Sequence, residues 1–342
     1  MAGIRDLARE LNLAVSTVSR ALNDHPTTSA KTKALVREAA ARLGYVANQS
    51  GRSLRRGSTG AIGFVIETGA RVSGQSDAFF LNVSDGVQSV LARHGLDLVA
   101  LLSPSEEDPN AFLQRMVARD YVDGIILSHI RRVDPRISFL AGRNLPFVTL
   151  GRSLTDGGQP WLDLDFDGFA AQSVARLVSR GYRRIGLVVP PPDLNVVSLL
   201  TEGFRRHLAA AGLALEEAHL FAASPNEEGG YAAARQLAGL AQRPEAVVLT
   251  NVSHTLGFYR GLSEQGLRPG RHVGVIGFAS ESSHYLTPRL TAFYQSPREI
   301  GIRLAEALLP LLARPVPGAP PPRILRETWS VSLIEGESDP GL

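Results

Sequence analysis

From residue 60 onward, short apolar runs alternate with amphipathic segments, and this alternation occurs twice. The first series predicts strands at 61–66, 96–102, 124–127 and 146–150 and helices at 80–94 and 111–119. The second predicts helices at 169–179, 201–211, 231–241, 256–265 and 297–312 and strands at 184–189, 246–250 and 273–278. Strands alternating with helices form parallel sheets covered on both faces. We therefore predict an α/β core of two lobes, each a doubly wound parallel sheet.

Two lobes of this kind leave a cleft at the carboxyl ends of their strands, where ligands bind. Chain crossovers near 150–162 and 291–296 are expected to join the lobes. A proline-rich connector at 314–323 precedes a last strand at 324–333. The predicted core spans 59–335, with one lobe at about 60–160 and 293–320 and the other at about 161–292 and 321–335.

The first 46 residues follow a different pattern, that of three short helices. Apolar spacing predicts helices at 4–11, 15–22 and 30–43, the third capped by Ser29. The residues expected to face inward on the second and third helices are Val15, Val18, Leu22, Leu35, Val36, Ala39 and Leu43. Two short helices joined by a tight turn and braced by a third indicate a helix-turn-helix domain at 1–46.

The second of these helices carries Ser16, Thr17, Ser19 and Arg20 on its remaining surface. Small hydroxyls bond phosphates and base edges without bulk, and arginine offers a bidentate donor to guanine. Residues 1–56 hold ten Lys and Arg against four Asp and Glu, whereas the remainder holds 26 against 29. A basic N-terminal part on a mildly acidic body is typical of a DNA-binding regulator.

Residues 47–58 are small, polar and basic, with a single leucine at position 54. Such a segment serves either as a flexible linker or as a helix that folds only on DNA. In the second case its arginines lie along phosphates and Leu54 wedges between base steps in the minor groove. From these residues alone, the linker interpretation is favoured.

Several classes of function lack their usual residue patterns. The chain has no cysteine, and no Gly-rich phosphate loop, nucleophile elbow or metal-ligand spacing is evident. Asp163, Asp165 and Asp167 alternate as in a calcium loop, but the glycine comes too early and no glutamate closes the motif. The N-terminus has no continuous apolar core of a signal peptide, and no apolar run is long enough for a membrane span. We predict a cytoplasmic protein that is not an enzyme, with no cofactor and no metal.

The stretches IRDLARELNLAVSTVSRALN, SAKTKALVREAAARLGYVAN and RSLRRGSTGAIGFVI resemble, in this order, the lactose-repressor (LacI/GalR) family of bacterial transcription regulators. The resemblance implies a core similar to periplasmic sugar-binding proteins, and it favours the hinge-helix interpretation of 47–58. It also implies a homodimer, since the chain lacks the C-terminal leucine heptads of tetrameric members. The DNA-binding residues that it implies are Val15, Ser16, Thr17, Ser19, Arg20, Asn23, Arg52, Leu54 and Arg55.

The effector site is where the sequence departs from its relatives. Sugar-binding members commonly have an arginine where this chain has Leu200, Asn-Asp where it has Asn251-Val252, and Gly-Phe-Asp-Asp where it has Gly-Phe-Ala279-Ser280. Arginine and aspartate bond sugar hydroxyls, so their loss indicates a different ligand orientation, a less polar ligand or a weakened response. The candidate effector-binding residues are Phe79, Ser128, His129, Arg152, Asp163, Asp165, Asn195, Leu200, Asn251, Ala279 and Glu281.

These observations predict a dimeric repressor of a carbohydrate-utilisation operon. It would bind a palindromic operator and respond to a small molecule, a sugar or sugar derivative, in the interlobe cleft. The alternatives are a sugar-binding module with weak or lost DNA regulation, and a regulator with a non-sugar effector. The salt dependence of DNA binding distinguishes the regulator from the sugar-binding module.

Overall fold

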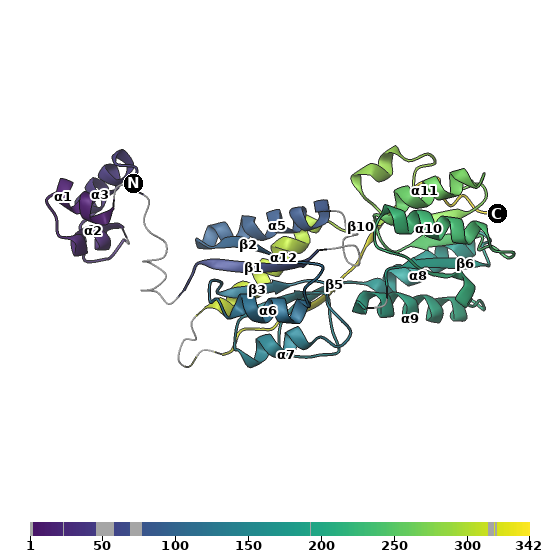
Figure 1. Cartoon of the computed structure of the whole chain (residues 1–342), viewed down its shortest axis with the longest axis horizontal. Helices are drawn as coiled ribbons and strands as arrows, with labels where there is room; N and C mark the ends of the chain where they lie inside the picture. The colour runs from purple at the N-terminus through teal and green to yellow at the C-terminus, as the bar shows by residue number, and fades with distance from the viewer. Residues whose placement is uncertain are drawn as a thin grey trace. The chain divides into compact units, whose positions relative to one another are not determined.

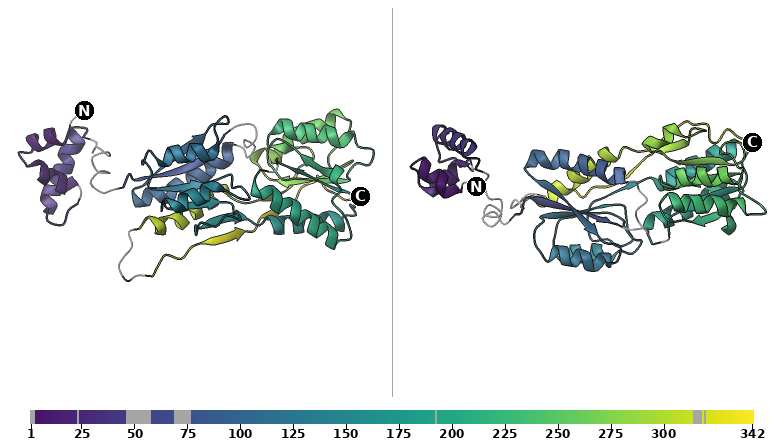
Figure 2. Two further views of the ribbon diagram at one scale, coloured as in Figure 1. Left: turned by 60° about the horizontal axis from the view of Figure 1, so that its bottom comes forward. Right: turned by 45° about the horizontal axis from the view of Figure 1, so that its top comes forward.

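The computed structural model describes residues 3–22, 24–45, 58–68, 77–191, 193–313, 318 and 320–342. The chain forms two compact units, residues 1–59 and 60–342, which are shown in Figures 1 and 2 and treated separately below. No helix among the described residues is long and apolar enough to cross a membrane.

The described residues of the N-terminal unit form three helices, α1 (Ile4–Glu10), α2 (Val15–Leu22) and α3 (Ala30–Arg42). The hydroxyl of Ser29 caps α3 by accepting from the Thr32 N–H at 3.2 Å, as the sequence predicts. The small core consists of Leu7, Ala8, Val18, Ala21, Val36, Ala39 and Ala40. Two predicted inward positions are wrong: Val15 is 41% exposed and Leu35 is 48% exposed. The small side chains of Ala21, Ala39 and Ala40 are buried in the core of this unit instead.

The first lobe is a six-stranded parallel sheet with the order β11-β5-β4-β3-β1-β2. Its strands are β1 (Ala61–Glu67), β2 (Asp97–Ser103), β3 (Gly124–Leu127), β4 (Phe147–Leu150), β5 (Trp161–Leu164) and β11 (Arg326–Trp329). Helices α5 (Asp77–Leu91) and α12 (Pro297–Leu312) pack on one face, and α6 (Pro109–Val117) and α7 (Pro135–Gly142) on the other. Ile62 and Phe64 point to the first face and Val65 to the second, so buried strands read as continuous apolar runs.

The second lobe repeats this plan with the order β12-β10-β9-β8-β6-β7, in which only β12 runs antiparallel to its neighbour. Its strands are β6 (Ile185–Val189), β7 (Leu220–Ala222), β8 (Ala246–Leu249), β9 (Gly274–Phe278), β10 (Thr291–Tyr294) and β12 (Ser332–Ile334). Helices α8 (Phe166–Ser179) and α9 (Asn195–Ala210) cover one face, and α10 (Glu227–Ala238) and α11 (His254–Glu264) the other. Short 3₁₀ turns lie at Ala92–His94, Glu217–His219 and Glu281–Tyr285.

The described chain passes between the lobes three times, after β5, after β10 and after β11. This corrects the predicted lobe boundaries. Residues 161–164 and 326–329 pair with each other in the sheet of the first lobe, although the sequence assigns both to the second lobe. The predicted crossover at 150–162 contains the first two residues of β5, and the one at 291–296 contains all of β10. The predicted last strand at 324–333 covers β11 and most of β12, which lie in different sheets. The strand-to-lobe assignment depends on pairing partners that are distant in sequence, which local apolar patterns do not report.

Each lobe holds one pair of helices in backbone contact through glycine. A Cβ on Gly86 of α5 would collide with the Arg298 carbonyl oxygen, and one on Gly301 of α12 with that of Val83. In the second lobe, Gly230 of α10 and Gly257 of α11 make the same reciprocal approach to His254 O and Glu227 O. Glycine is needed here because any side chain would separate the two helix backbones.

Candidate functional site

Helix α2 exposes the residues predicted to bind DNA. Val15, Ser16 and Arg20 are exposed, and Thr17 and Ser19 are half-buried beside the fully buried Val18. The Arg20 Nε donates to Ser16 O at 3.3 Å along the exposed side of the helix. Asn23, Arg52, Leu54 and Arg55, with nearly all of the predicted hinge segment, lie outside the described residues. The predicted face is therefore available on α2 in a unit whose sequence is strongly basic.

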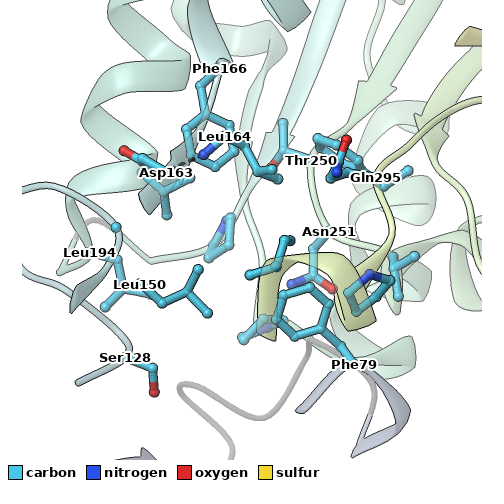
Figure 3. Close-up of a pocket in the computed structure, with 18 of the residues that line it drawn as sticks. Phe79, Ser128, Leu150, Asp163, Leu164, Phe166, Leu194, Thr250, Asn251 and Gln295 are labelled. Carbon is cyan, nitrogen blue, oxygen red and sulfur yellow. Dashed lines mark hydrogen bonds between the residues drawn. The ribbon is translucent and has the colours of Figure 1, made fainter. Parts of the chain in front are cut away.

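A cavity of about 670 Å³ lies between the two lobes of residues 60–342. Both lobes supply its walls, largely through segments that follow the carboxyl ends of β3, β4, β6, β8 and β9. This is where doubly wound sheets place their ligands. Figure 3 shows Asp163, Leu164 and Phe166 together at one part of the cavity and Phe79 at another. The volume is within the range of small-molecule sites.

Most residues predicted to bind the effector line this cavity. They are Phe79, Ser128, His129, Arg152, Asp163, Asn195, Leu200, Asn251 and Ala279. Asp165 does not line it, because its side chain caps α8 by accepting from the Gly168 N–H at 2.9 Å. The side chain of Glu281 lies outside the described residues. The assignment of Asp165 to the effector site is thus corrected.

The sequence prediction missed much of the apolar wall. The additional apolar lining residues include Phe80, Leu150, Leu164, Phe166, Pro190, Leu194, Phe278, Phe293 and Ile300. Leu150, Pro190 and Phe278 end or directly follow predicted strands, which was the available signal, but a phenylalanine at such a position reads equally well as core. The sequence also does not predict the polar lining residues Thr250 and Gln295.

Arg152, Asp163 and Asn195 form a polar corner of the cavity. The Arg152 Nε lies 3.3 Å from Asp163 Oδ2, and the Asn195 Nδ2 donates to Arg152 O at 2.7 Å. Arg152 Nε and Asn195 Oδ1 are buried atoms without a hydrogen-bond partner. Burial raises the pKa of the Asp163 carboxyl to about 6, against the opposing effects of Arg152 and the Leu164 N–H. A group with both donor and acceptor capacity would complete this corner.

The Asp163 carboxyl should make the protein less stable above pH 6. Its pKa is higher in the folded state than in an unfolded chain, so folding is favoured while it is protonated and this contribution is lost as pH rises from about 4 to about 6. The loss is at most about 3 kcal/mol. We expect urea midpoints of Asp163→Asn to lack this component when compared with the original chain at pH 4.5 and pH 7. Equal pH dependence in the two proteins would contradict the assignment.

The loop after β3 is held in shape by buried charges. The Arg136 guanidinium donates to Asp134 Oδ1 and Oδ2 at 2.9 and 2.7 Å, to Glu67 Oε1 at 2.6 Å and to His129 O at 2.8 Å. Arg131 donates to both oxygens of Glu67 at 2.9 Å. His129, which lines the cavity, has a left-handed φ of 54° within this loop. The network therefore fixes a strained backbone beside the cavity.

The same loop contacts the second lobe directly. The Asn195 N–H donates to Ile130 O at 2.9 Å, and Arg131 and Leu194 form an isolated antiparallel bridge. Outside the cavity, Arg132 and Glu202 form an ion pair of 3.2 Å. Backbone contacts between the lobes thus lie next to the polar corner, so a ligand there touches the contact between the lobes.

Within the described part of the chain, no group of three or more His, Asp and Glu side chains is placed to hold a metal ion. His254 is fully buried, and its Nε2 faces Ser224 O at 2.9 Å instead of the cavity. Burial lowers the pKa of His254 to about 4. The chemistry that the cavity offers is hydrogen bonding and apolar contact.

Two family descriptions match the chain. Residues 3–48 match bacterial regulatory proteins of the lacI family, and residues 174–338 match the periplasmic binding protein-like domain. The HTH-type transcriptional regulator AglR of Rhizobium meliloti (strain 1021) is 31% identical over 315 residues, covering 90% of this chain and 86% of AglR.

Solved structures of transcriptional regulators are also similar. A complex of the transcriptional regulator CelR with cellobiose aligns with a TM-score of 0.73 at 25% identity, covering 99% of this chain and 100% of that one. The lac repressor dimer bound to operator and the anti-inducer ONPF aligns with a TM-score of 0.86 at 21% identity, covering 99% of both chains. The predicted helix-turn-helix and two-lobed α/β fold is confirmed.

Proposed function

The chain belongs to the lacI family of bacterial regulatory proteins and is a DNA-binding transcriptional regulator, and we propose that it represses carbohydrate-utilisation genes as a homodimer on a palindromic operator. A small molecule in the interlobe cavity would control this binding. In this proposal the protein acts in the cytoplasm, where the operator is, and catalyses no reaction. The observation that carries the proposal is the surface of α2, where Ser16 and Arg20 are exposed beside the half-buried hydroxyls of Thr17 and Ser19.

In the proposed complex, α2 lies in the major groove of each half-site. Val15 and Ser16 would face base edges, and Thr17, Ser19 and Arg20 would contact phosphates or bases. The predicted hinge segment would follow the DNA with Arg52 and Arg55 and insert Leu54 into the minor groove. Two half-sites are needed because one α2 of eight residues reads only a few base pairs.

Control by the effector would act through the arrangement of the two lobes. The cavity is lined by both lobes, and its polar corner adjoins the backbone contacts between Ile130 and Asn195. A ligand that binds one arrangement of the lobes more tightly shifts the population toward it. The effector thereby changes the fraction of dimers able to hold both half-sites.

Loss of the Arg20 side chain should weaken operator binding about tenfold or more, because a bidentate arginine contact contributes about 1–3 kcal/mol. The operator is a palindromic duplex selected by the full chain from a random library, and fluorescence anisotropy measures the dissociation constant for Arg20→Ala. The matched control is Arg205→Ala, which removes an exposed, ion-paired arginine from the two-lobed unit and should leave the affinity for the operator unchanged. The affinity of the original chain should also fall steeply as salt rises.

Two results would contradict this function. If selection returns no specific duplex although ligands stabilise the chain, the result favours a sugar-binding module without DNA regulation. If Arg20→Ala and Arg205→Ala have equal effects, α2 does not contact the operator bases or phosphates as proposed.

A further inference from the structure

The polar atoms of the cavity are distributed unevenly. Thr250 and Ser128 donate their hydroxyl hydrogens to Val188 O and Val65 O at 2.8 and 2.7 Å. The side-chain oxygen of Asn251 accepts from the Ser253 N–H at 2.9 Å. These groups are largely committed to the protein, so they have less capacity for a ligand than their number suggests.

The polar corner holds further hydrogen-bonding capacity. Asn195 Oδ1 is a buried acceptor without a hydrogen-bond partner, Asn195 is 4% exposed, and the guanidinium of Arg152 lines the cavity beside it. The single arginine is balanced by the buried carboxyl of Asp163 at 3.3 Å. An anionic ligand would meet this carboxylate, whereas a hydroxyl can accept from Arg152 and donate to Asn195. The corner therefore suits a neutral, hydroxyl-bearing group.

Much of the remaining lining is apolar. Phe166, Leu200, Phe278 and Phe293 line the cavity together with Pro190 and Leu194. Phe278 stacks on Phe169 with ring centroids 4.6 Å apart, which holds its ring in place. A free sugar has hydroxyls around its whole ring, and those outside the corner would lose their water partners against these walls. An aryl or alkyl group would be buried there favourably.

Building on the proposed function, we propose that the effector is a glycoside with an apolar aryl or alkyl substituent, and that the cavity discriminates against the free sugar. Hydroxyls of the sugar ring would bind at Arg152, Asp163 and Asn195. The apolar substituent would contact the aromatic and aliphatic side chains of the remaining wall. The ligand class follows from the polar corner at one part of the cavity and the apolar side chains that line much of the rest.

Titration calorimetry on the full chain tests this inference with three sets of probes. The first is a panel of 4-nitrophenyl α- and β-glycosides of glucose, galactose, xylose and mannose, the second the corresponding free sugars, and the third 4-nitrophenol. We expect at least one glycoside to bind ten or more times more tightly than both its free sugar and 4-nitrophenol. A free sugar that binds as tightly as its glycoside overturns the inference, and so does 4-nitrophenol that binds as tightly as any glycoside.

Variants of two side-chain amides test the binding mode. Asn195→Leu removes the unused acceptor and should weaken the best glycoside tenfold or more, at an unchanged stoichiometry and with cooperative melting retained. Gln172→Leu is the matched control, because Gln172 is exposed on α8 and does not line the cavity. Equal losses in the two variants overturn the polar-corner assignment.

The selected operator duplex separates this inference from the proposed function. If the chain binds the duplex but no glycoside, the inference on the ligand is wrong and the regulator function stands. If glycosides bind as expected but no duplex does, the ligand inference holds and the proposed DNA function is wrong.

Discussion

Replacing Arg136 with methionine is expected to lower the free energy of unfolding by about 3–5 kcal/mol. Arg136 is 1% exposed, and it is paired with Asp134 and Glu67, which are also buried. Methionine retains the apolar stem but leaves Asp134 without its cation and Glu67 with Arg131 alone. Removing the cation lowers the free energy of unfolding by more than the intact ion pair contributes to it, because the remaining carboxylates stay buried and cannot be solvated by water.

Urea denaturation followed by circular dichroism measures this loss. Arg115→Met is the matched control, since Arg115 also binds a glutamate, Glu107, through two nitrogens but at the surface. We expect the control to shift the midpoint far less, because water replaces a surface ion pair. Similar midpoints for the two variants would show that the Arg136 network is not a determinant of stability.

Replacing Gly257 with alanine should lower the free energy of unfolding, although the same substitution within a helix usually raises it. Alanine within a helix is normally favoured over glycine by about 1 kcal/mol. Here the new Cβ would collide with the Glu227 carbonyl oxygen and lie 2.8 Å from the Tyr231 N of the facing helix α10. Overpacking of backbone against backbone forces the helices apart, and we expect a loss of about 1–3 kcal/mol or more.

The control is Gly239→Ala, at the end of α10. The nearest atom to its Cβ would be 3.6 Å away, and its φ of −78° suits alanine. Thermal melting should place Gly239→Ala at or slightly above the original chain and Gly257→Ala several degrees below it. If Gly257→Ala melts at the temperature of the original chain, the close approach of α10 and α11 is not a constraint on the fold.

Features determined by local sequence were predicted well. Helix α2 begins at Val15 and ends at Leu22, and Ser29 caps α3, as the sequence indicates. Both depend on residues close together in the chain. The sequence predicts less well which side of a short helix is buried. Val15 and Ala21 are each three residues from Val18, and only tertiary packing decides which of the two is buried with it.

Features determined by distant pairing were predicted poorly. Strands β5 and β11 lie more than 150 residues apart and pair in register from Trp161 with Arg326. The sequence does not predict helix α7 or strands β5 and β7, since segments of three to eight residues are too short to show a clear periodic pattern. The location of the cavity followed from the fold, but its apolar character did not, because the half-buried Phe166 and Phe278 look the same in sequence whether they face a core or a ligand.

The placement of β11 and β12 has a consequence for how the protein is synthesised. Each completes the edge of a different sheet, and both leave the ribosome after the other strands of the two lobes. A nascent chain that has reached residue 325 therefore lacks one edge strand in each lobe. The three-helix unit needs only contacts within its first 45 residues, and such local contacts form early. During translation, the N-terminal three-helix unit can therefore fold before the two-lobed unit has all the strands of its sheets.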